Sequence, residues 1–178
     1  MSPINLPMDS LPPTPSVRIC RADYADPDHA QALLSLLDAY ARDPMGGGAP
    51  LSAFALAHLV PALAARPQAF SVLAFGGRDG NLPVGLVNCI EGFSTFACRT
   101  LVNVHDVAVL PGYRGQRVAE KMLALVEEIA YERGACKLTL EVLQGNAPAI
   151  KLYHRVGFAN YQLDPAMGQA QFLQKWLK

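Results

Sequence analysis

The residues most able to do chemistry lie between positions 110 and 119, where an apolar strand runs directly into a long amphipathic helix. Backbone N–H groups at a helix N-terminus are free and carry the positive end of the helix dipole, and small residues such as Gly115 and Ala119 let an anion approach the main chain. Arg114 and Arg117 add positive charge there. The segment predicts a phosphate site, and the alternative is an ordinary strand-to-helix connection with two exposed arginines.

Hydrophobic periodicity places this segment in a strand–helix–strand unit. Residues 101–110 are predicted as a strand, residues 115–133 as an amphipathic helix, and residues 137–143 as a second strand. A crossover of this kind joins parallel strands, and ligands usually lie at the carboxyl ends of parallel strands. On the first strand, His105 and Asp106 point to opposite faces unless a bulge changes the phase.

The rest of the chain predicts a sheet with helices around it. An Asp26–Pro27 start and an Asp43–Pro44 end define the first helix. The further elements predicted are strands over residues 17–21, 70–75, 82–90, 158–162 and 170–177, and helices over residues 51–65 and 146–156. Strands and helices in this order indicate an α/β (α+β) fold with a mixed, twisted sheet of about seven strands and flanking helices.

Composition and charge limit the class of protein. The chain has 178 residues, of which 51% are hydrophobic and 17% are charged, which fits one globular domain. We expect that domain at residues 17–178, after a Pro-rich, flexible N-terminal tail at residues 1–16. Lys and Arg number 15, and Asp and Glu also number 15, so no overall positive field exists for nucleic acid or an anionic membrane.

The four cysteines predict no metal site, because they form no CxxC pair and no histidine stands at zinc-finger spacing. Unpaired cysteines suit a reducing compartment. Residues 1–10 carry no Lys or Arg and no continuous apolar core, which argues against a secretory signal, and no apolar stretch approaches the ~18 residues of a membrane span. We therefore expect a soluble, cytoplasmic protein.

Two short runs follow known motif patterns in the correct order. Residues 114–119, RGQRVA, follow Gln/Arg-x-x-Gly-x-Gly/Ala at the first and sixth positions, with Arg117 at the middle Gly. Residues 146–158, NAPAIKLYHRVGF, follow Asn-x-x-Ala-x-x-Leu-Tyr-x-x-x-Gly-Phe throughout. These are the coenzyme A pyrophosphate loop and a second signature of the GNAT superfamily of N-acetyltransferases, which the chain resembles.

The resemblance implies a GNAT-like acyl-CoA N-acyltransferase fold, in which a splayed pair of parallel strands holds acetyl-CoA or coenzyme A. The main chain of Val107 and Val109 would bond the pantetheine arm, and the loop at residues 114–119 would hold the pyrophosphate. The implied cofactor-binding residues are Val107, Ala108, Val109, Arg114, Gly115, Gln116, Arg117, Val118, Ala119, Asn146 and Tyr153.

The resemblance also assigns catalytic roles. Tyr153 matches the family's acid, and a phenol with a reference pKa near ~10 can donate to a departing thiolate while staying protonated at rest. His105 and Asp106 occupy the strand positions where similar enzymes carry Glu-Asp, so they are the candidate bases. His105 is the first choice, because its reference pKa of about 6.5 suits proton acceptance near neutrality. Asp106 and a water chain are the alternatives.

The implied reaction is direct transfer of an acetyl group to a primary amine on a small molecule or a peptide. The loop at residues 40–51 stands where the family builds its acceptor pocket, so Tyr40 and Asp43 could meet a cationic amine. The alternatives are a helix-end aromatic and a turn-forming Asp. Many similar domains dimerise, so a homodimer is expected.

Other functions stay open at this point. Arg117 in the Gly position suits a non-catalytic acyl-CoA-binding or sensing module. A transferase of longer acyl groups is a nearer alternative. A third is a subunit whose main function is association through the last strand and Trp176.

Overall fold

The computed structural model describes residues 17–162, 164, 166, 168 and 170–177, so the tail predicted at residues 1–16 lies outside the described residues. Within them, one sheet has the strand order β1–β2–β3–β4–β5. Its strands are β1 (Arg18–Arg21), β2 (Ala69–Gly76), β3 (Leu82–Ser94), β4 (Arg99–Val109) and β5 (Leu138–Leu140). The first three pairings are antiparallel and β4 pairs with β5 in parallel, which confirms a mixed sheet that ends in a parallel pair.

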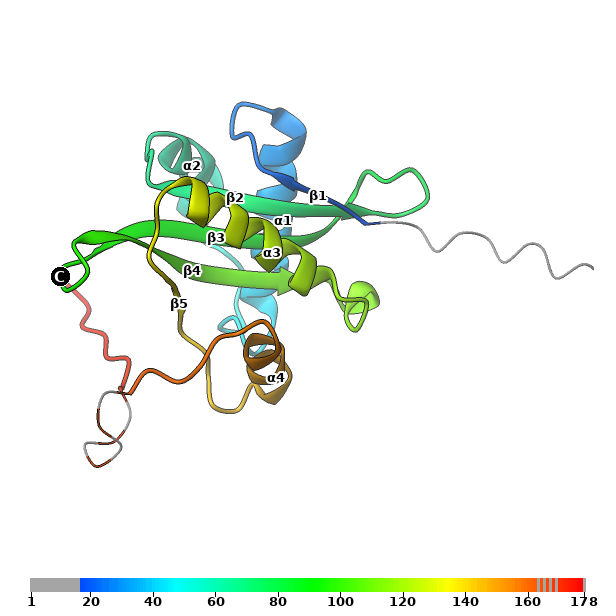
Figure 1. Ribbon diagram of the computed structural model, residues 1–178. Helices are drawn as coiled ribbons and strands as arrows, with labels where there is room; N and C mark the ends of the chain where they lie inside the picture. Colours follow the sequence, from blue (N-terminus) through cyan, green and yellow to red (C-terminus); the bar gives the residue numbers. More distant parts are fainter. Residues whose placement is uncertain (1–16, 163, 165, 167, 169, 178) are drawn as a thin grey trace, which may run out of the picture.

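Helices cover both faces of the sheet (Figure 1). They are α1 (Pro27–Arg42), α2 (Ala53–Ala64), α3 (Val118–Glu132) and α4 (Ala147–Arg155). The start of α1 follows from its sequence, because the Asp26 carboxylate accepts the backbone N–H groups of Asp28 and His29, and Pro27 occupies the first turn. In the chain, α3 follows β4 and precedes β5, and it crosses one face of the sheet to connect these two parallel strands.

Two hydrophobic clusters hold these layers together. On one face, α3 packs Val118, Met122 and Val126 against β2, β3 and β4. On the other, α1 and α2 pack Leu33 and Val60 against the opposite side of the same strands. The sheet is therefore a wall between two separately packed faces, and the side chains of β4 divide between them.

The prediction of about seven strands is wrong, because the described residues form five. Residues 158–162 and 170–177 pair with no other strand, and β5 is shorter than the predicted range 137–143. The side chains of Phe172, Leu173, Trp176 and Leu177 are exposed. Alternating apolar residues are compatible with a strand, but a strand also needs an available edge, and β5 pairs with its neighbour over only three residues.

The predicted start of α3 at Gly115 is also wrong. The helix begins at Val118, because Gly115 has a φ of 76° and Arg117 a φ of 58°, and neither value continues a right-handed helix. A short 3₁₀ turn at Pro111–Tyr113 comes between β4 and this loop. The segment that the sequence assigned to the first helical turn is therefore a loop that leads into the helix.

Among the described residues, no helix combines the length and the apolar character that crossing a bilayer requires.

Candidate active site

A β-bulge lies in the middle of β4. Asn88 of β3 pairs with Asp106, whereas the next residue, Cys89, pairs with Val104, so His105 is an extra residue on β4. As a result Val104 and Val107, three positions apart, both contribute to the α3-side cluster. The bulge that the sequence left open is present, and the simple alternation of β4 does not hold across it.

The bulge coincides with the place where β4 and β5 separate. Their pairing ends at Val104 and Leu140, although β4 continues to Val109. The Leu110 N–H donates to the Val84 carbonyl of β3. In an antiparallel pair only every second residue bonds to a given neighbour, so the N–H and C=O groups of Val107 and Val109 point away from β3. These groups line an open strand edge, which can pair with an extended ligand.

The N-terminus of α3 lies just beyond the end of β4. Arg117 occupies its N-cap in the left-handed region, with φ 58° and ψ 22°, and its side chain caps no backbone N–H. The first N–H groups of the helix, on Val118, Ala119 and Glu120, therefore lack a side-chain cap and remain available to an anion. The positive φ explains why a Gly suits this position, and Arg117 shows that the backbone adopts it with a side chain present.

The Arg114 guanidinium contacts two groups of the protein. Its Nε donates to the Val109 carbonyl at 3.0 Å, and its Nη2 lies 3.0 Å from Oδ2 of Asp43. Gln116, in the same loop, donates from Nε2 to the Gly112 carbonyl at 2.9 Å. The predicted phosphate loop is therefore tied to the end of α1 and to the open edge of β4.

Asp43 closes the C-terminus of α1 and begins the Gly-rich loop. Its Oδ1 accepts the Met45 N–H at 2.9 Å. That backbone bond, together with the Arg114 guanidinium, holds the pKa of Asp43 below its usual value. Asp43 therefore carries a full negative charge at neutral pH, and one of its oxygens is already occupied by Arg114.

Tyr40 connects the predicted base to the predicted acid. Burial raises its pKa, and the carboxylates of Asp106 and Asp43 raise it further. Burial, with Tyr40 as a lesser cause, raises the pKa of Tyr153 to about 12. The charges of Asp106 and Asp43 act on Tyr40, and Tyr40 acts on Tyr153, which indicates that these four residues lie in the same region of the fold.

This region spans the sheet. Tyr40 packs against the cluster beneath α1 and α2, and Tyr153 of α4 packs against the cluster beneath α3. Tyr153 also lies edge-on to Phe158, with ring centroids 5.9 Å apart. Tyr40 and Tyr153 therefore pack on opposite faces of the sheet, and Tyr40 still affects the pKa of Tyr153.

The two candidate bases have different environments. His105, the extra residue of the bulge, is exposed, whereas Asp106 is half-buried. Asp106 accepts a hydrogen bond at Oδ2 from Nδ2 of Asn88 at 3.0 Å. Among the described residues, no Lys or Arg forms an ion pair with Asp106.

Asn146 begins α4 as its N-cap, and its Oδ1 accepts the Ala149 N–H at 3.3 Å. Its Nδ2 is directed elsewhere than this cap, so it keeps donor capacity. Arg155 at the other end of α4 pairs with Glu120 in the first turn of α3 at 2.6 Å. This ion pair joins α4 to α3 beside the uncapped N-terminus.

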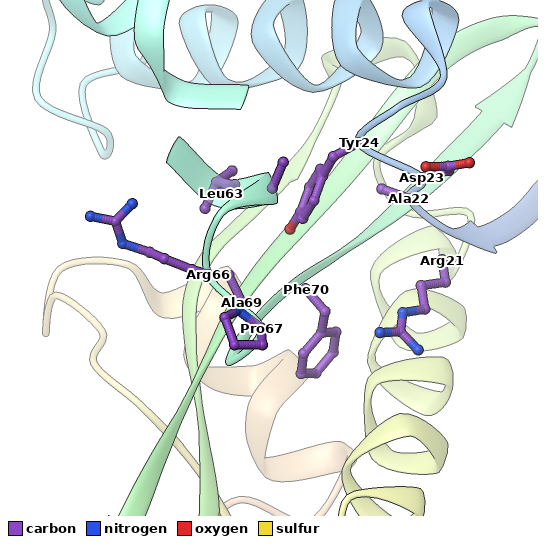
Figure 2. Close-up of a pocket in the computed structure, with 10 residues that line it drawn as sticks. Arg21, Ala22, Asp23, Tyr24, Leu63, Arg66, Pro67, Ala69 and Phe70 are labelled. Atoms are coloured by element: carbon purple, nitrogen blue, oxygen red, sulfur yellow. The ribbon is translucent and has the colours of Figure 1, made fainter. Parts of the chain in front are cut away.

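Two polar residues that were not predicted from the sequence, Ser71 and Asn88, stand in otherwise apolar strands. Ser71 is 0% exposed and Asn88 is 6% exposed. They lead from Asp106 toward Tyr24, which lines a surface pocket of about 230 Å³. Figure 2 shows this pocket with Arg21 and Arg66 on opposite sides. A polar residue at the centre of an apolar strand was the available signal.

Comparison with known proteins places the chain in a family. The model of the acetyltransferase (GNAT) family matches residues 30–158. Streptothricin acetyltransferase of Streptomyces lavendulae is 38% identical over 110 residues, which cover 53% of this chain and 58% of that protein. The chain spans about half the length of the curated relatives it matches.

Solved structures share the fold. A probable acetyltransferase has a TM-score of 0.74 and 20% identity, covering 90% of this chain and 99% of that one. An aminoglycoside N-acetyltransferase in complex with coenzyme A has a TM-score of 0.69 and 15% identity, covering 93% and 99%.

A mixed sheet that opens between two parallel strands, beside an uncapped helix N-terminus, defines a domain of the acyltransferase class. The family match covers most of the chain. The protein belongs to the acetyltransferase (GNAT) family.

Proposed function

We propose that this protein is an N-acetyltransferase that moves an acetyl group from acetyl-CoA directly to a primary amine. The observation that carries the proposal is the opening of β4 from β5 at the bulge, next to the α3 N-terminus. A site of this shape can bind an extended acyl carrier at one face and an amine at the other.

The residues present fit coenzyme A. The N–H and C=O groups of Val107 and the N–H group of Val109 would pair with the amide groups of the pantetheine arm, while the Val109 carbonyl already accepts a hydrogen bond from Arg114. The uncapped N–H groups of Val118 and Ala119 would bind the pyrophosphate, because a helix N-terminus favours an anion. When bound, acetyl-CoA supplies the acetyl group as an activated thioester and leaves as a thiolate.

Tyr153 faces the leaving group in this proposal. Because its pKa is about 12, the phenol keeps its proton at neutral pH. A thiol has an ordinary pKa near ~8.5, so complete proton transfer from this phenol to a thiolate would be unfavourable. Tyr153 therefore acts by donating a hydrogen bond to the negative charge on sulfur as it develops.

Asp106 acts on the amine. A primary ammonium has a pKa near ~10.4, so it must lose a proton before its nitrogen can attack. Asp106 is half-buried and has no ion-pair partner among the described residues, and it would attract the ammonium and accept the proton directly or through a water. His105 is exposed, and it is the alternative base.

The acceptor in this proposal is a cationic small-molecule amine. Tyr40 lies near two carboxylates, those of Asp106 and Asp43, which favour a positive group. The names of a sequence relative and of a structural neighbour, a streptothricin acetyltransferase and an aminoglycoside acetyltransferase, point to acceptors of this kind. A peptide amine would need contacts beyond this cluster.

The cellular setting is also part of the proposal. The four cysteines are free in the structure, which suits the reducing cytoplasm. A homodimer would cover apolar side chains that are exposed in the single chain, among them Phe172 and Trp176.

Calorimetric titration tests the coenzyme part of the proposal. We expect acetyl-CoA and CoA to bind with one site per chain, and acetyl-CoA to be consumed only when an amine is present. Butyryl-CoA and longer thioesters, used as controls, should turn over more slowly. Binding without consumption in the presence of a broad panel of amines would support a sensing module instead.

A further inference from the structure

A line of four hydrogen-bonded side chains runs from Tyr24 across strands β2, β3 and β4 and ends at Asp106. Tyr24 Oη lies 2.9 Å from Ser71 Oγ, and Ser71 Oγ donates to Asn88 Oδ1 at 2.6 Å. Asn88 Nδ2 then donates to Asp106 Oδ2 at 3.0 Å. The last three residues are direct neighbours across β2, β3 and β4, since Ser71 pairs with Asn88 and Asn88 with Asp106.

The direction of each hydrogen bond in this line is determined. A serine hydroxyl has one proton, and Ser71 uses it toward the Asn88 carbonyl oxygen. Tyr24 must therefore donate to Ser71, although either oxygen could do so in isolation. Every proton in the line points toward Asp106, and the line ends on an acceptor.

The side chains at the centre of this line are buried, and buried polar groups are not needed to fill the space between apolar neighbours. Ser71 is 0% exposed and Asn88 is 6% exposed, and both stand among apolar neighbours of β2 and β3. Buried polar groups contribute little net stability compared with apolar groups of the same shape, but they fix one geometry when every member is satisfied. Replacing both partners of a buried hydrogen bond by apolar groups of the same shape costs little stability, so packing alone does not require polar residues here.

We propose that Asn88, Ser71 and Tyr24 are positioning residues that hold the Asp106 carboxylate toward the acceptor amine. Asn88 holds Oδ2, so the whole carboxylate, including Oδ1, keeps one orientation. Ser71 and Tyr24 prevent the Asn88 amide from turning. This inference rests on the proposed function, because it concerns the group assigned to the amine.

The groups around Asp106 come from several elements. Burial raises the pKa of Tyr40 on α1 and the pKa of the Cys89 thiol on β3, and the charge of Asp106 raises both further. His105 precedes it on the bulge. Because these neighbours are not members of the line, variants of Asn88, Ser71 and Tyr24 leave them in place.

A double-mutant cycle tests the inference. Asn88→Leu removes the donor at similar volume, and we expect kcat to fall about 10- to 100-fold while KM for acetyl-CoA changes little, because a small misplacement of a catalytic group has effects of this size. In the background of Asp106→Asn, the same change should have no further effect on kcat. Equal losses in both backgrounds would overturn the proposal, because Asn88 would then act independently of Asp106.

The remote members provide a second measurement that does not depend on how well Asn88→Leu folds. Tyr24→Phe and Ser71→Ala should each lower kcat several-fold and move the acid limb of the pH–rate profile to higher pH. Ser35→Ala is the matched control, because it removes a hydroxyl that donates to the Ala32 carbonyl on α1, outside the line. Unchanged kcat and unchanged limbs in Tyr24→Phe and Ser71→Ala would contradict the proposal.

Failure of the proposed function gives a different result. In that case the unmodified protein acetylates no amine. The cycle is then measured by urea unfolding across pH, where coupling between Asn88→Leu and Asp106→Asn should appear at neutral pH and disappear in acid. Coupling that is absent at every pH would overturn the inference about Asp106.

Discussion

Tyr153 shows how the fold prepares a residue for one task. Its place on α4, packed against the α3-side cluster and edge-on to Phe158, withdraws the phenol from water and raises its pKa to about 12. The raised pKa keeps the proton available as a donor and opposes its loss. The sequence motif singled out this residue, and in the proposed mechanism its raised pKa favours donation of a hydrogen bond over complete proton transfer.

Replacing Tyr153 by Phe should lower kcat about 100-fold and leave KM for acetyl-CoA nearly unchanged, because only the hydroxyl is lost. The unmodified protein should show no basic limb from Tyr153 below about pH 10, since the phenol titrates near 12. Steady-state kinetics across pH measure both effects. Tyr131→Phe, at an exposed position on α3, is the control. Full activity in Tyr153→Phe would remove this residue from the mechanism.

His105 and Asp106 are separated by substitution. Asp106→Asn should lower kcat/KM about 100-fold or more, because the group that attracts the ammonium and accepts its proton loses its charge. His105→Ala should leave the pH–rate profile unaltered, since His105 is exposed on the bulge. Loss of a limb near pH ~6.5 in His105→Ala would instead identify the imidazole as the base.

Arg117 carries backbone strain at the start of α3. A non-Gly residue in the left-handed region costs roughly 1–2 kcal/mol, and a Gly there pays an entropy cost of its own, so Arg117→Gly should stabilise the protein by about 0.5–1 kcal/mol. Arg117→Ala keeps the strain and should give no such gain. Urea unfolding compares the two variants. A Gly variant that is no more stable than the Ala variant would show that the left-handed backbone at residue 117 stores no strain.

Among the secondary-structure elements, the bulge in β4 determines where the open strand edge of the candidate site lies. It leaves Val104 in register with Leu140 and gives Val107 and Val109 an open edge, at the point where β5 turns away. The Arg114 side chain then connects this edge to Asp43 at the end of α1. The end of α1 and the segment that follows β4, which are far apart in the chain, therefore meet at Arg114.

Two arginines allow a matched test of that loop. Arg114 and Arg42 are 58% and 59% exposed, and each pairs with an aspartate of the α1 region. Substitution of either by Gln should change the free energy of unfolding by less than about 1 kcal/mol, as for other exposed ion pairs. Only Arg114→Gln should weaken binding of acetyl-CoA, by about tenfold, because it removes positive charge beside the α3 N-terminus. Equal coenzyme affinities in calorimetry would contradict a role for Arg114.

Local features of the sequence predicted the elements well and their partners poorly. The Asp26 cap, the amphipathic stripe of α3 and the motif around Tyr153 are encoded within a few residues, so their positions could be predicted. The bulge at His105 depends on the register with β3, which no single strand specifies. The predicted strand at residues 170–177 failed for the same reason, since alternation does not provide an edge to pair with.

For the whole molecule, the sheet separates two packed hydrophobic clusters, and Tyr40 and Tyr153 belong to opposite ones. Balanced total charge, with 15 basic and 15 acidic residues, leaves local placement to determine what binds. A carboxylate-rich spot on the α1 side and an uncapped helix N-terminus on the α3 side suit a cationic amine and an anionic coenzyme, respectively.

Acetyl transfer itself is the most direct test of this arrangement. The purified protein is incubated with acetyl-CoA and a panel of amines, with free CoA followed by a thiol reagent and the amine followed by mass spectrometry. We expect CoA release and acetylated amine to appear in equal amounts, most rapidly with cationic small molecules, and Asp106→Asn and Tyr153→Phe both to suppress them. Release of CoA without an acetylated amine, or no release with any amine despite tight coenzyme binding, would contradict the proposed function.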